Sequence, residues 1–498
     1  MSHIQKKKKV IIVGAGPGGL SSAMILAHRG YEVIVYEKQS YVGGRTSALK
    51  AGDFTFELGP TFVMLPQAFE EVFEKAGRKL SDYVDMRRLD TMYRLKFGDG
   101  RNFVVPFDKE KMKQEIARLF PGDEKGYERY LHKQKRKFDL MYPCLKVPYM
   151  RWYHYFRPRL LKAFFFMQNF TSVYDVMASY FKYDDMRISM TFQAKYLGMS
   201  PWHCPGAFSI LSYIEHAFGI FHPIGGVHKI TEAMAQIVTE EGGSVILNTP
   251  IKKILTEDGK AVGVVFADDS VDRADYVIMN ADFAAGMTHL VPEENRGTWT
   301  DAELKKRPFS CSTFMLYIGL DKKYDFPHHN IFFADNYKQN IEQIFEGKKL
   351  PEDPSFYIQN ASVTDSTLAP DGKSTIYVLV PVPNLDANID WDTEKKRYRD
   401  LVIQKISEKT EMHDIAHHIE IERVITPKDW ESKLDVYKGA VFNLSHTIGQ
   451  MLYFRPHNKF KELPGLFLVG GGTHPGSGLP TIIESGRIAA DLISEDIT

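Results

Sequence analysis

The stretch VIIVGAGPGGLSSAMILAHRGYEVIVYEK, residues 10–38, decides the fold of this chain. It begins with four apolar residues typical of a buried strand, and Gly14, Gly16 and Gly19 follow in G-x-G-x-x-G order. A helix-compatible segment and a second strand come next, and Glu37 stands at the end of that strand. This order predicts a Rossmann-type β-α-β unit that binds an ADP-containing dinucleotide.

Each residue of this motif has a mechanical role in the prediction. Gly14 permits a tight turn, Gly16 lets the backbone approach a pyrophosphate, and Gly19 lets the helix pack on the strand. The helix N-terminus supplies N–H groups for the phosphates, and Glu37 can accept hydrogen bonds from a ribose. A glycine-rich turn without a ligand is the alternative, and the complete strand–turn–helix–strand–acid order argues against it.

Two further motifs follow closely. Residues 42–45, VGGR, place flexible backbone and the fixed cation of Arg45 beside the same pyrophosphate. Residues 54–61, FTFELGPT, are typical of an alternating strand that ends in a sharp Gly59-Pro60 turn. A solvated surface turn is the alternative for the first motif, and a purely structural turn is the alternative for the second.

A second glycine loop lies near the other end of the chain. Residues 469–480, VGGGTHPGSGLP, precede a segment with the apolar stripe of a helix, and Pro480 is well tolerated at a helix start. A flavin ring gains negative charge on reduction, which a helix N-terminus stabilises, whereas a nicotinamide dehydrogenase has no such need. The two loops together therefore predict a flavin site. His474, inside the second loop, either packs structurally or lines the reaction site.

A basic and aromatic stretch occupies residues 149–170, YMRWYHYFRPRLLKAFFFMQNF. No Asp or Glu occurs between Leu140 and Tyr174. The cations of this region are Lys146, Arg151, Arg157, Arg159 and Lys162, and the aromatics among them are Trp152, Tyr153, Tyr155, Phe156 and Phe164 to Phe166. Basic residues with interfacial aromatics predict a segment that lies on an anionic membrane surface. An amphipathic helix packed on the protein with a solvated basic face is the alternative.

Composition narrows the function classes. The formal net charge is zero, so no global attraction to nucleic acid exists. Three distant cysteines without metal-type spacing indicate a reducing cytoplasm, and no apolar run is long enough for a signal peptide or a membrane span. We interpret Met186, Met190 and Met199 as core residues, and as ordinary the histidines His203, His216, His222, His328 and His329. Glu215 and Glu484 are candidate bases only through their proximity to glycine-rich segments.

The order of segments predicts a discontinuous nucleotide domain. Residues 1–95, 225–290 and 426–498 form the dinucleotide-binding domain in this prediction. Residues 96–224 form a helical, membrane-associating substrate region, and residues 291–425 contribute the sheet of an α+β substrate domain together with covering elements. The predicted class is therefore α/β, with a substrate domain inserted into a Rossmann-type domain.

The motifs together resemble one family. The G-x-G-x-x-G unit with Glu37, VGGR at 42–45, F-x-x-G-P-T ending at Thr61, and G-x-T-H-P-G-x-G-x-P at 471–480 resemble the bacterial carotenoid desaturases, within the flavin amine oxidase-like superfamily. Further segments are similar to the C30 branch, the dehydrosqualene (4,4′-diapophytoene) desaturases: Asp82-Tyr83, SCSTFMLYIGL at 310–320, NIEQIFEG at 340–347 and LAPDGK at 368–373.

The resemblance implies an enzyme with non-covalent FAD that desaturates a long linear polyene by hydride transfer to the flavin. The residues that it and the motifs place near FAD are Gly14, Gly16, Gly19, Glu37, Lys38, Gly44, Arg45, Gly59, Pro60, Thr61, Ile251, Gly471, Gly472, Thr473, Gly478, Leu479 and Pro480. No catalytic acid or base is identifiable. Oxygen or a quinone is the expected electron acceptor, because no second dinucleotide motif is present.

Three alternatives and a location complete the expectations. A terminal-methyl oxygenase and a carotenoid isomerase of the same superfamily are alternative enzymes, and a non-catalytic prenyl-lipid-binding protein is an alternative of another class. We expect a cytoplasmic protein, peripheral on the inner face of the cell membrane, with self-association possible and with neither metal nor nucleic acid.

Overall fold

The computed structural model describes residues 7–168 and 170–496. Residue 169 and the side chains of Tyr155 and Phe165, which belong to the predicted membrane-facing stretch, lie outside the described residues. The predicted N-terminal unit is confirmed as strand β1 (Lys9–Val13), helix α1 (Pro17–His28) and strand β2 (Glu32–Tyr36). Nearly every residue of α1 is buried, because neighbouring elements cover the helix on several sides.

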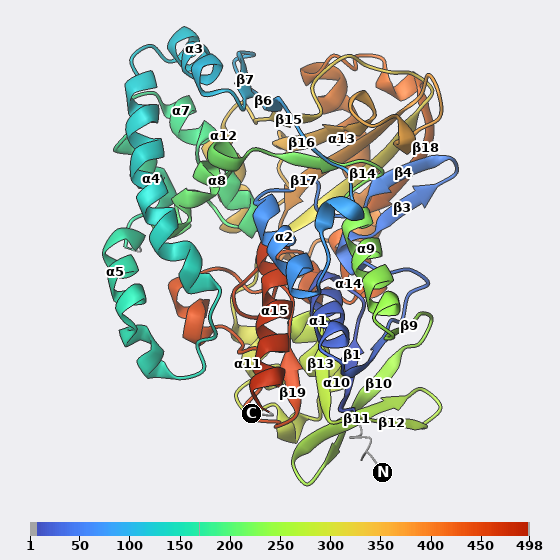
Figure 1. The fold of residues 1–498 in the computed structure, drawn as a ribbon. Coiled ribbons are helices and arrows are strands. Elements are labelled where there is room, and N and C mark those ends of the chain that lie inside the picture. The colour runs from blue at the N-terminus through green and yellow to red at the C-terminus, as the bar shows by residue number, and fades with distance from the viewer. Residues whose placement is uncertain (1–6, 169, 497–498) are drawn as a thin grey trace.

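The nucleotide sheet is parallel and has the order β19-β13-β1-β2-β9. Its remaining strands are β9 (Ser244–Ile246), β13 (Tyr276–Met279) and β19 (Leu466–Leu468). These strands come from the start, the middle and the end of the chain, so the discontinuous Rossmann-type architecture is confirmed. Helix α15 (Leu479–Glu495) packs beside α1, so that segments from the first and the last part of the chain lie side by side (Figure 1).

Other elements cover the two faces of this sheet. Helix α9 (His228–Glu240) packs on α1, and α2 (Pro66–Lys75) packs on α15. The opposite side carries α10 (Phe283–Leu290) and an antiparallel sheet of β10 (Ile251–Glu257), β11 (Lys260–Phe266) and β12 (Val271–Arg273). Each face of the sheet thus packs against its own apolar core.

A seven-stranded sheet forms the second layer system, in the order β18-β14-β17-β16-β15-β6-β7. Its strands are β6 (Thr91–Lys96), β7 (Asn102–Pro106), β14 (Ser312–Leu320), β15 (His329–Phe332), β16 (Phe356–Asn360), β17 (Ser374–Val382) and β18 (Ile419–Ile425). Helix α13 (Trp391–Lys409) covers one face (Figure 1). Strand β6 belongs to this sheet, which therefore begins before the predicted boundary at residue 96. The division of the chain into these three regions stays a prediction.

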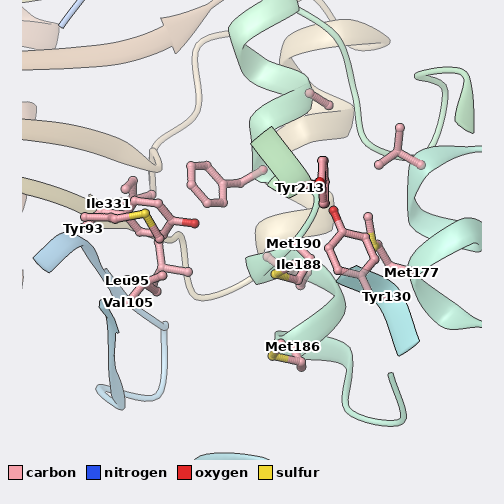
Figure 2. Packing of buried hydrophobic residues seen from close by; sticks show 14 of the residues in the cluster. Tyr93, Leu95, Val105, Tyr130, Met177, Met186, Ile188, Met190, Tyr213 and Ile331 are labelled. Carbon is pink, nitrogen blue, oxygen red and sulfur yellow. The ribbon is translucent and has the colours of Figure 1, made fainter. Parts of the chain in front are cut away.

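The region between β7 and β8 is mainly helical, as predicted. Its helices are α3 (Lys109–Leu119), α4 (Glu124–Leu145), α5 (Pro158–Met167), α6 (Val173–Ala178), α7 (Asp184–Ser189) and α8 (Ile210–Phe218). Figure 2 shows Met186 and Met190 of this region among the side chains of the core, in the cluster that also contains Tyr130 and Tyr213. The interpretation of these methionines as core residues is confirmed.

Shorter elements connect the layers. They are the hairpin of β3 (Ala48–Ala51) and β4 (Phe54–Glu57), the pair of β5 (Met86–Arg88) and β8 (Phe221–Pro223), and the helices α11 (Asp301–Lys306), α12 (Tyr337–Phe345) and α14 (Pro427–Leu434).

Candidate active site

The N-terminal glycine turn has the geometry that the sequence predicts. Gly14 has φ +101°, a left-handed conformation that favours glycine, and Gly16 caps the N-terminus of α1. A Cβ atom at Gly19 would lie 2.5 Å from the carbonyl oxygen of Gly14. Gly19 is therefore a packing residue, which lets α1 approach the end of β1.

Glu37 ties the turn to the end of β2. Its carboxylate is buried and accepts backbone hydrogen bonds from Ala15 (2.7 Å) and Gln39 (2.9 Å). Glu37 thus orients the glycine turn and at the same time lines the cavity in front of it.

That cavity, which we call the nucleotide cavity, has a volume of about 470 Å³. The predicted residues that line it are Gly14, Gly16, Glu37, Lys38, Gly44, Arg45, Ile251, Gly471 and Gly472. Gly19 and Thr473 stand outside its lining and support it from behind. The Thr473 hydroxyl donates to the Gly470 carbonyl at 2.9 Å and so holds the C-terminal glycine loop.

The end of β13 contributes two residues that the sequence reasoning missed. The Asn280 amide donates to the Gly14 carbonyl at 3.0 Å. The Asp282 carboxylate accepts a hydrogen bond from Asn443 (2.7 Å) and lies 3.5 Å from the Arg45 guanidinium. Burial raises the pKa of Asp282 above its usual value. The signal was present, because polar residues after a strand of a parallel sheet stand at the edge where ligands bind.

A second cavity of about 280 Å³, which we call the apolar cavity, adjoins the first. The predicted residues in its lining are Gly59, Pro60, Thr61, Gly478, Leu479, Pro480 and, again, Arg45. Aromatic and aliphatic side chains complete it, among them Met315 of the seven-stranded sheet, Phe192 of the helical region, and Phe62 between β4 and α2. Arg45, Thr46 and Ile482 line both cavities, so the predicted cofactor residues divide between two adjoining spaces.

A polar cluster stands behind one wall of the apolar cavity. The Tyr357 hydroxyl donates to Thr61 Oγ1 (2.9 Å) and is hydrogen-bonded to His329 Nδ1 (2.7 Å). Three buried histidines gather there: His222, His328 and His329. Burial holds the pKa of both His328 and His329 well below the usual value. These histidines are ordinary by their sequence spacing, and their proximity arises only in the tertiary fold.

The C-terminal loop is held by another residue that sequence reasoning missed. Arg455 is buried, and its guanidinium donates to the carbonyls of Gly471 (2.6 Å) and Thr473 (3.0 Å). Burial lowers the pKa of Arg455 to about 9. His474 is buried against the Tyr149 ring and is hydrogen-bonded to the Val147 carbonyl, and it lines neither cavity. Of its two predicted roles, the geometry therefore favours structural packing.

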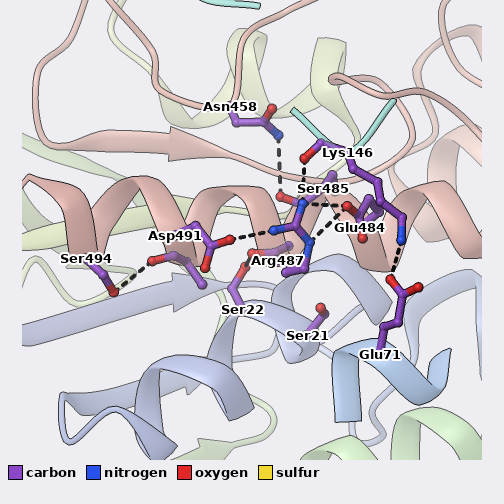
Figure 3. Close-up of polar contacts among 12 residues, drawn as sticks. Ser21, Ser22, Glu71, Lys146, Asn458, Glu484, Ser485, Arg487, Asp491 and Ser494 are labelled. Carbon is purple, nitrogen blue, oxygen red and sulfur yellow. Dashed lines mark hydrogen bonds and ion pairs between the residues drawn. The ribbon is translucent and has the colours of Figure 1, made fainter. Parts of the chain in front are cut away.

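The two candidate bases of the sequence are both engaged elsewhere. Figure 3 shows Glu484 on α15 in an ion pair with Arg487, at 2.6 Å. Glu215 accepts hydrogen bonds from Tyr93 (3.0 Å) and Gln193 (2.7 Å). Neither carboxylate lines one of the two cavities. The geometry therefore favours structural roles for both.

Comparisons with known proteins identify the family and the fold. The model of the flavin containing amine oxidoreductase family matches residues 17–494. Among solved structures, an oxidoreductase from Methanosarcina mazei is similar with a TM-score of 0.64 at 16% identity, over 98% of this chain and 100% of that one. Putrescine oxidase gives a TM-score of 0.64 at 16% identity, over 98% and 99% of the two chains. A RAB GDI from Plasmodium falciparum shares the fold with a TM-score of 0.56 at 12% identity, over 99% and 98%.

Curated relatives show to which group within this family the chain belongs. A 4,4′-diapophytoene desaturase (4,4′-diapolycopene-forming) from Methylomonas sp is 47% identical over 98% of this chain and 95% of its own length. An all-trans-zeta-carotene desaturase from Myxococcus xanthus is 36% identical over 98% of this chain and 94% of its own length. The chain therefore belongs to the flavin containing amine oxidoreductases and, within them, to the carotenoid desaturases.

FAD is accordingly the cofactor, and the residues of the nucleotide cavity fit it. A Cβ atom at Gly16 would lie 2.8 Å from the Asn280 amide nitrogen, so the turn has no room for a side chain there and the backbone of Gly16 itself lines the cavity. The Asp282 side chain is nearly buried and lines this cavity, where its carboxylate can accept hydrogen bonds from a ligand that carries hydroxyl groups. Within residues 7–168 and 170–496, no helix combines the length and the apolar character needed to cross a bilayer.

Proposed function

We propose that this protein is an FAD-dependent desaturase of a linear C30 carotenoid precursor, 4,4′-diapophytoene. The observation that carries the proposal is the apolar cavity, which shares Arg45, Thr46 and Ile482 with the nucleotide cavity. The name of the Methylomonas relative supplies the substrate class. The site residues assigned to FAD in the sequence remain part of this proposal.

The bound flavin supplies the capacity to accept a hydride from carbon. The residues of this chain supply alignment and exclusion of water. Phe62 and Met315 give the apolar cavity a surface that suits a polyene. The N-terminus of α15, at Gly478 and Leu479, directs partial positive charge at the same cavity and so stabilises negative charge that develops there.

The test is incubation of the purified protein with 4,4′-diapophytoene in liposomes, with 15-cis-phytoene as the C40 comparison. We expect products that lose two hydrogens per step from the C30 substrate, with longer-wavelength absorbance. A gain of oxygen would indicate the methyl oxygenase, and a product of unchanged mass would indicate the isomerase. Purified protein that takes up no flavin would favour the non-catalytic prenyl-lipid-binding protein. A substrate preference for phytoene would refute the C30 assignment alone.

The electron acceptor is proposed to be oxygen or a membrane quinone. The basis is the single dinucleotide turn found in the sequence, at residues 14–19. Turnover should stop after one flavin equivalent under strict anoxia and resume when a quinone is added. Continued turnover without any acceptor would overturn this part of the proposal. Self-association stays a prediction.

We further propose that the basic aromatic stretch contacts the inner membrane surface from the cytoplasm. In Figure 1, α5 lies at the edge of the molecule. Large apolar side chains are exposed on the 3-10 helix η3 (Trp152–Phe156) just before it, with Trp152 65% and Phe156 62% accessible. Arg151 and Arg159 are exposed beside them, whereas Arg157 is engaged with the Pro148 carbonyl. Such a surface favours attachment to anionic lipid.

Liposome flotation tests this contact. The triple variant Arg151→Glu, Arg159→Glu and Lys162→Glu should lose flotation with anionic vesicles. The matched control carries Lys323→Glu, Lys348→Glu and Lys349→Glu, which change the net charge equally at exposed positions elsewhere. Equal flotation of the two variants would show that the stretch does not face the membrane.

A further inference from the structure

One amine lines the apolar cavity. Lys195 lies on the 3-10 helix η4 (Phe192–Leu197) and is partly accessible from the cavity that it lines. Its Nζ atom stands 4.7 Å from the centre of the Tyr337 ring. The structure gives this amine neither a hydrogen bond nor an ion pair with any described residue. Burial lowers the pKa of Lys195 to about 7, against a smaller opposing effect of the nearby Cys311 thiol.

A second buried lysine shows what a structural amine is like in this protein. Burial also lowers the pKa of Lys137 to about 7. Its Nζ atom, however, donates to the Gly206 carbonyl (2.6 Å) and to the Ser209 hydroxyl (3.0 Å). Lys137 thus holds the loop before α8 to α4. Lys195 has no such bonds, so stability alone does not explain an amine at that position.

We propose that Lys195 accepts the proton that the substrate loses in each desaturation step. This inference rests on the proposed function. One carbon–hydrogen bond of the substrate gives its hydrogen and electron pair, as hydride, to the oxidised flavin. The carbon–hydrogen bond on the adjacent carbon gives its proton to the lone pair of Lys195 Nζ, and its electron pair becomes the second bond between the two carbons. The lysine ends as an ammonium and returns the proton to solvent before the next step.

The other polar groups that line the apolar cavity are poorer acceptors. The Arg45 guanidinium offers no lone pair for a proton. Burial raises the pKa of the Cys311 thiol to about 12, so the thiol is neutral and weakly basic at pH 7. The Tyr196, Tyr357 and Tyr377 hydroxyls also have raised pKa values through burial, and each stays protonated.

A neutral amine in the apolar cavity also favours the loss of hydride from the substrate. Positive charge develops on the carbon that loses hydride, and a permanent cation nearby would oppose it in a medium of low dielectric constant. An amine with a pKa near 7 is largely uncharged at slightly alkaline pH. The charged and titratable groups around Lys195 are Cys311 at the start of β14, Tyr337 on α12, Tyr196 on its own helix, and Arg45 across the cavity.

The test compares Lys195→Met and Lys195→Arg with the wild-type holoprotein. Methionine keeps the volume without an amine, and arginine keeps the charge without a lone pair. Lys133→Met is the control, since Lys133 is exposed and also stands over a tyrosine ring, that of Tyr180. The measurement is anaerobic bleaching of the flavin by 4,4′-diapophytoene in liposomes, between pH 5.5 and pH 9.5.

We expect the wild-type rate to rise through about pH 7 to a plateau. Both Lys195 variants should be slower by about 10²–10⁴-fold and should lose this inflection, while the control stays within about twofold. A Lys195→Met rate near that of the wild type, with the same pH profile, would overturn the inference and leave the proposed function intact. A fast Lys195→Arg variant would show that charge matters and proton acceptance does not. Absence of bleaching in the wild type would refute the proposed function and, with it, this inference.

A second readout needs no turnover. Cyanate carbamylates neutral amines only, so peptide mass spectrometry after brief labelling at each pH reports the titration of Lys195. We expect a midpoint near pH 7, with Lys133 as the exposed reference in the same sample. A midpoint at or above pH 10 would overturn the inference whatever the turnover experiments show.

Discussion

Glu215 should make the stability of this protein fall as the pH rises. The residue lies on α8, fully buried behind the apolar cavity. One carboxylate oxygen accepts hydrogen bonds from Tyr93 and Gln193, and the Tyr196 hydroxyl is a further hydrogen-bonding neighbour of the carboxylate. Burial raises the pKa of Glu215 to about 7 from an ordinary value of 4.5, although these hydrogen bonds oppose the change.

The sign of the effect follows from proton linkage. Below pH 4.5 the carboxyl is protonated in both the folded and the unfolded chain, and it contributes no pH dependence. Between pH 4.5 and about 7 the unfolded chain releases the proton while the folded chain retains it, so the free energy of unfolding decreases as the pH rises. At 1.36 kcal/mol for each unit between the two pKa values, the loss amounts to ~3 kcal/mol above pH 7.

Glu215→Gln removes the titration and keeps the size of the side chain. The amide oxygen can still accept from Tyr93, and Gln193 Oε1, which has no hydrogen-bond partner among the described residues, can accept from the new amide nitrogen after a flip. We therefore expect the variant to match the wild type within about 1 kcal/mol at pH 4.5 and to be ~3 kcal/mol more stable at pH 8.

Urea unfolding followed by tryptophan fluorescence at both pH values measures this difference. Other groups whose protonation changes on unfolding are common to both proteins and cancel in the comparison. The control is Glu462→Gln at an exposed position, whose effect on stability should be the same at both pH values. The reasoning fails if the stability difference between Glu215→Gln and the wild type does not change with pH.

Three further substitutions test the cavities. Gly19→Ala places a Cβ atom 2.5 Å from a backbone carbonyl, at a packing cost of ~1–3 kcal/mol, and should weaken FAD binding by about tenfold or more. The control Gly449→Ala, whose Cβ atom would have nothing within 4 Å, should leave FAD binding unchanged. Titration of flavin fluorescence measures both affinities. Arg45→Met should weaken FAD binding by ~1.5–3 kcal/mol without changing liposome flotation, and equal affinities would remove Arg45 from the site. Tyr357→Phe should destabilise the protein by ~1–3 kcal/mol in urea, because it leaves buried groups of Thr61 and His329 without their bonds; unchanged stability would show that this network is not maintained.

The sequence predicted those parts of the site that are built from residues close to one another in the chain. Gly14, Gly16 and Glu37 fall within one β-α-β unit, so their spacing alone specifies the turn. Asp282 was within reach, because the strand before it was visible in the sequence and its carboxyl end is where ligands bind. The role of Lys195 could not be predicted from the sequence, because it depends on the lack of hydrogen-bond partners in a cavity built from several distant segments. No local pattern encodes such an absence.

The sequence likewise does not predict that β6 belongs to the seven-stranded sheet, because this depends on pairing between distant segments. Its parallel partner β15 lies more than 200 residues further along the chain. Residues 91–96 read locally as a strand, and nothing in them specifies which of the two large sheets they join. The sheet that a strand joins is decided by its pairing with strands that are distant in the chain. The turn at residues 14–19, in contrast, is specified locally, by backbone conformations that few residues other than glycine allow.

The shared lining of the two cavities explains why two glycine loops from opposite ends of the chain are needed. Hydride transfer requires the donor and acceptor atoms to be in contact, so the ligands of the two cavities must meet where the cavities adjoin. That place is bounded by Arg45, which follows the N-terminal unit, and by Ile482 in the first turn of α15. Because α15 packs on α1, one helix pair fixes both loops at once. A change in that packing should therefore affect cofactor binding and substrate alignment together, whereas Lys195, on a separate element, should affect only the fate of the proton.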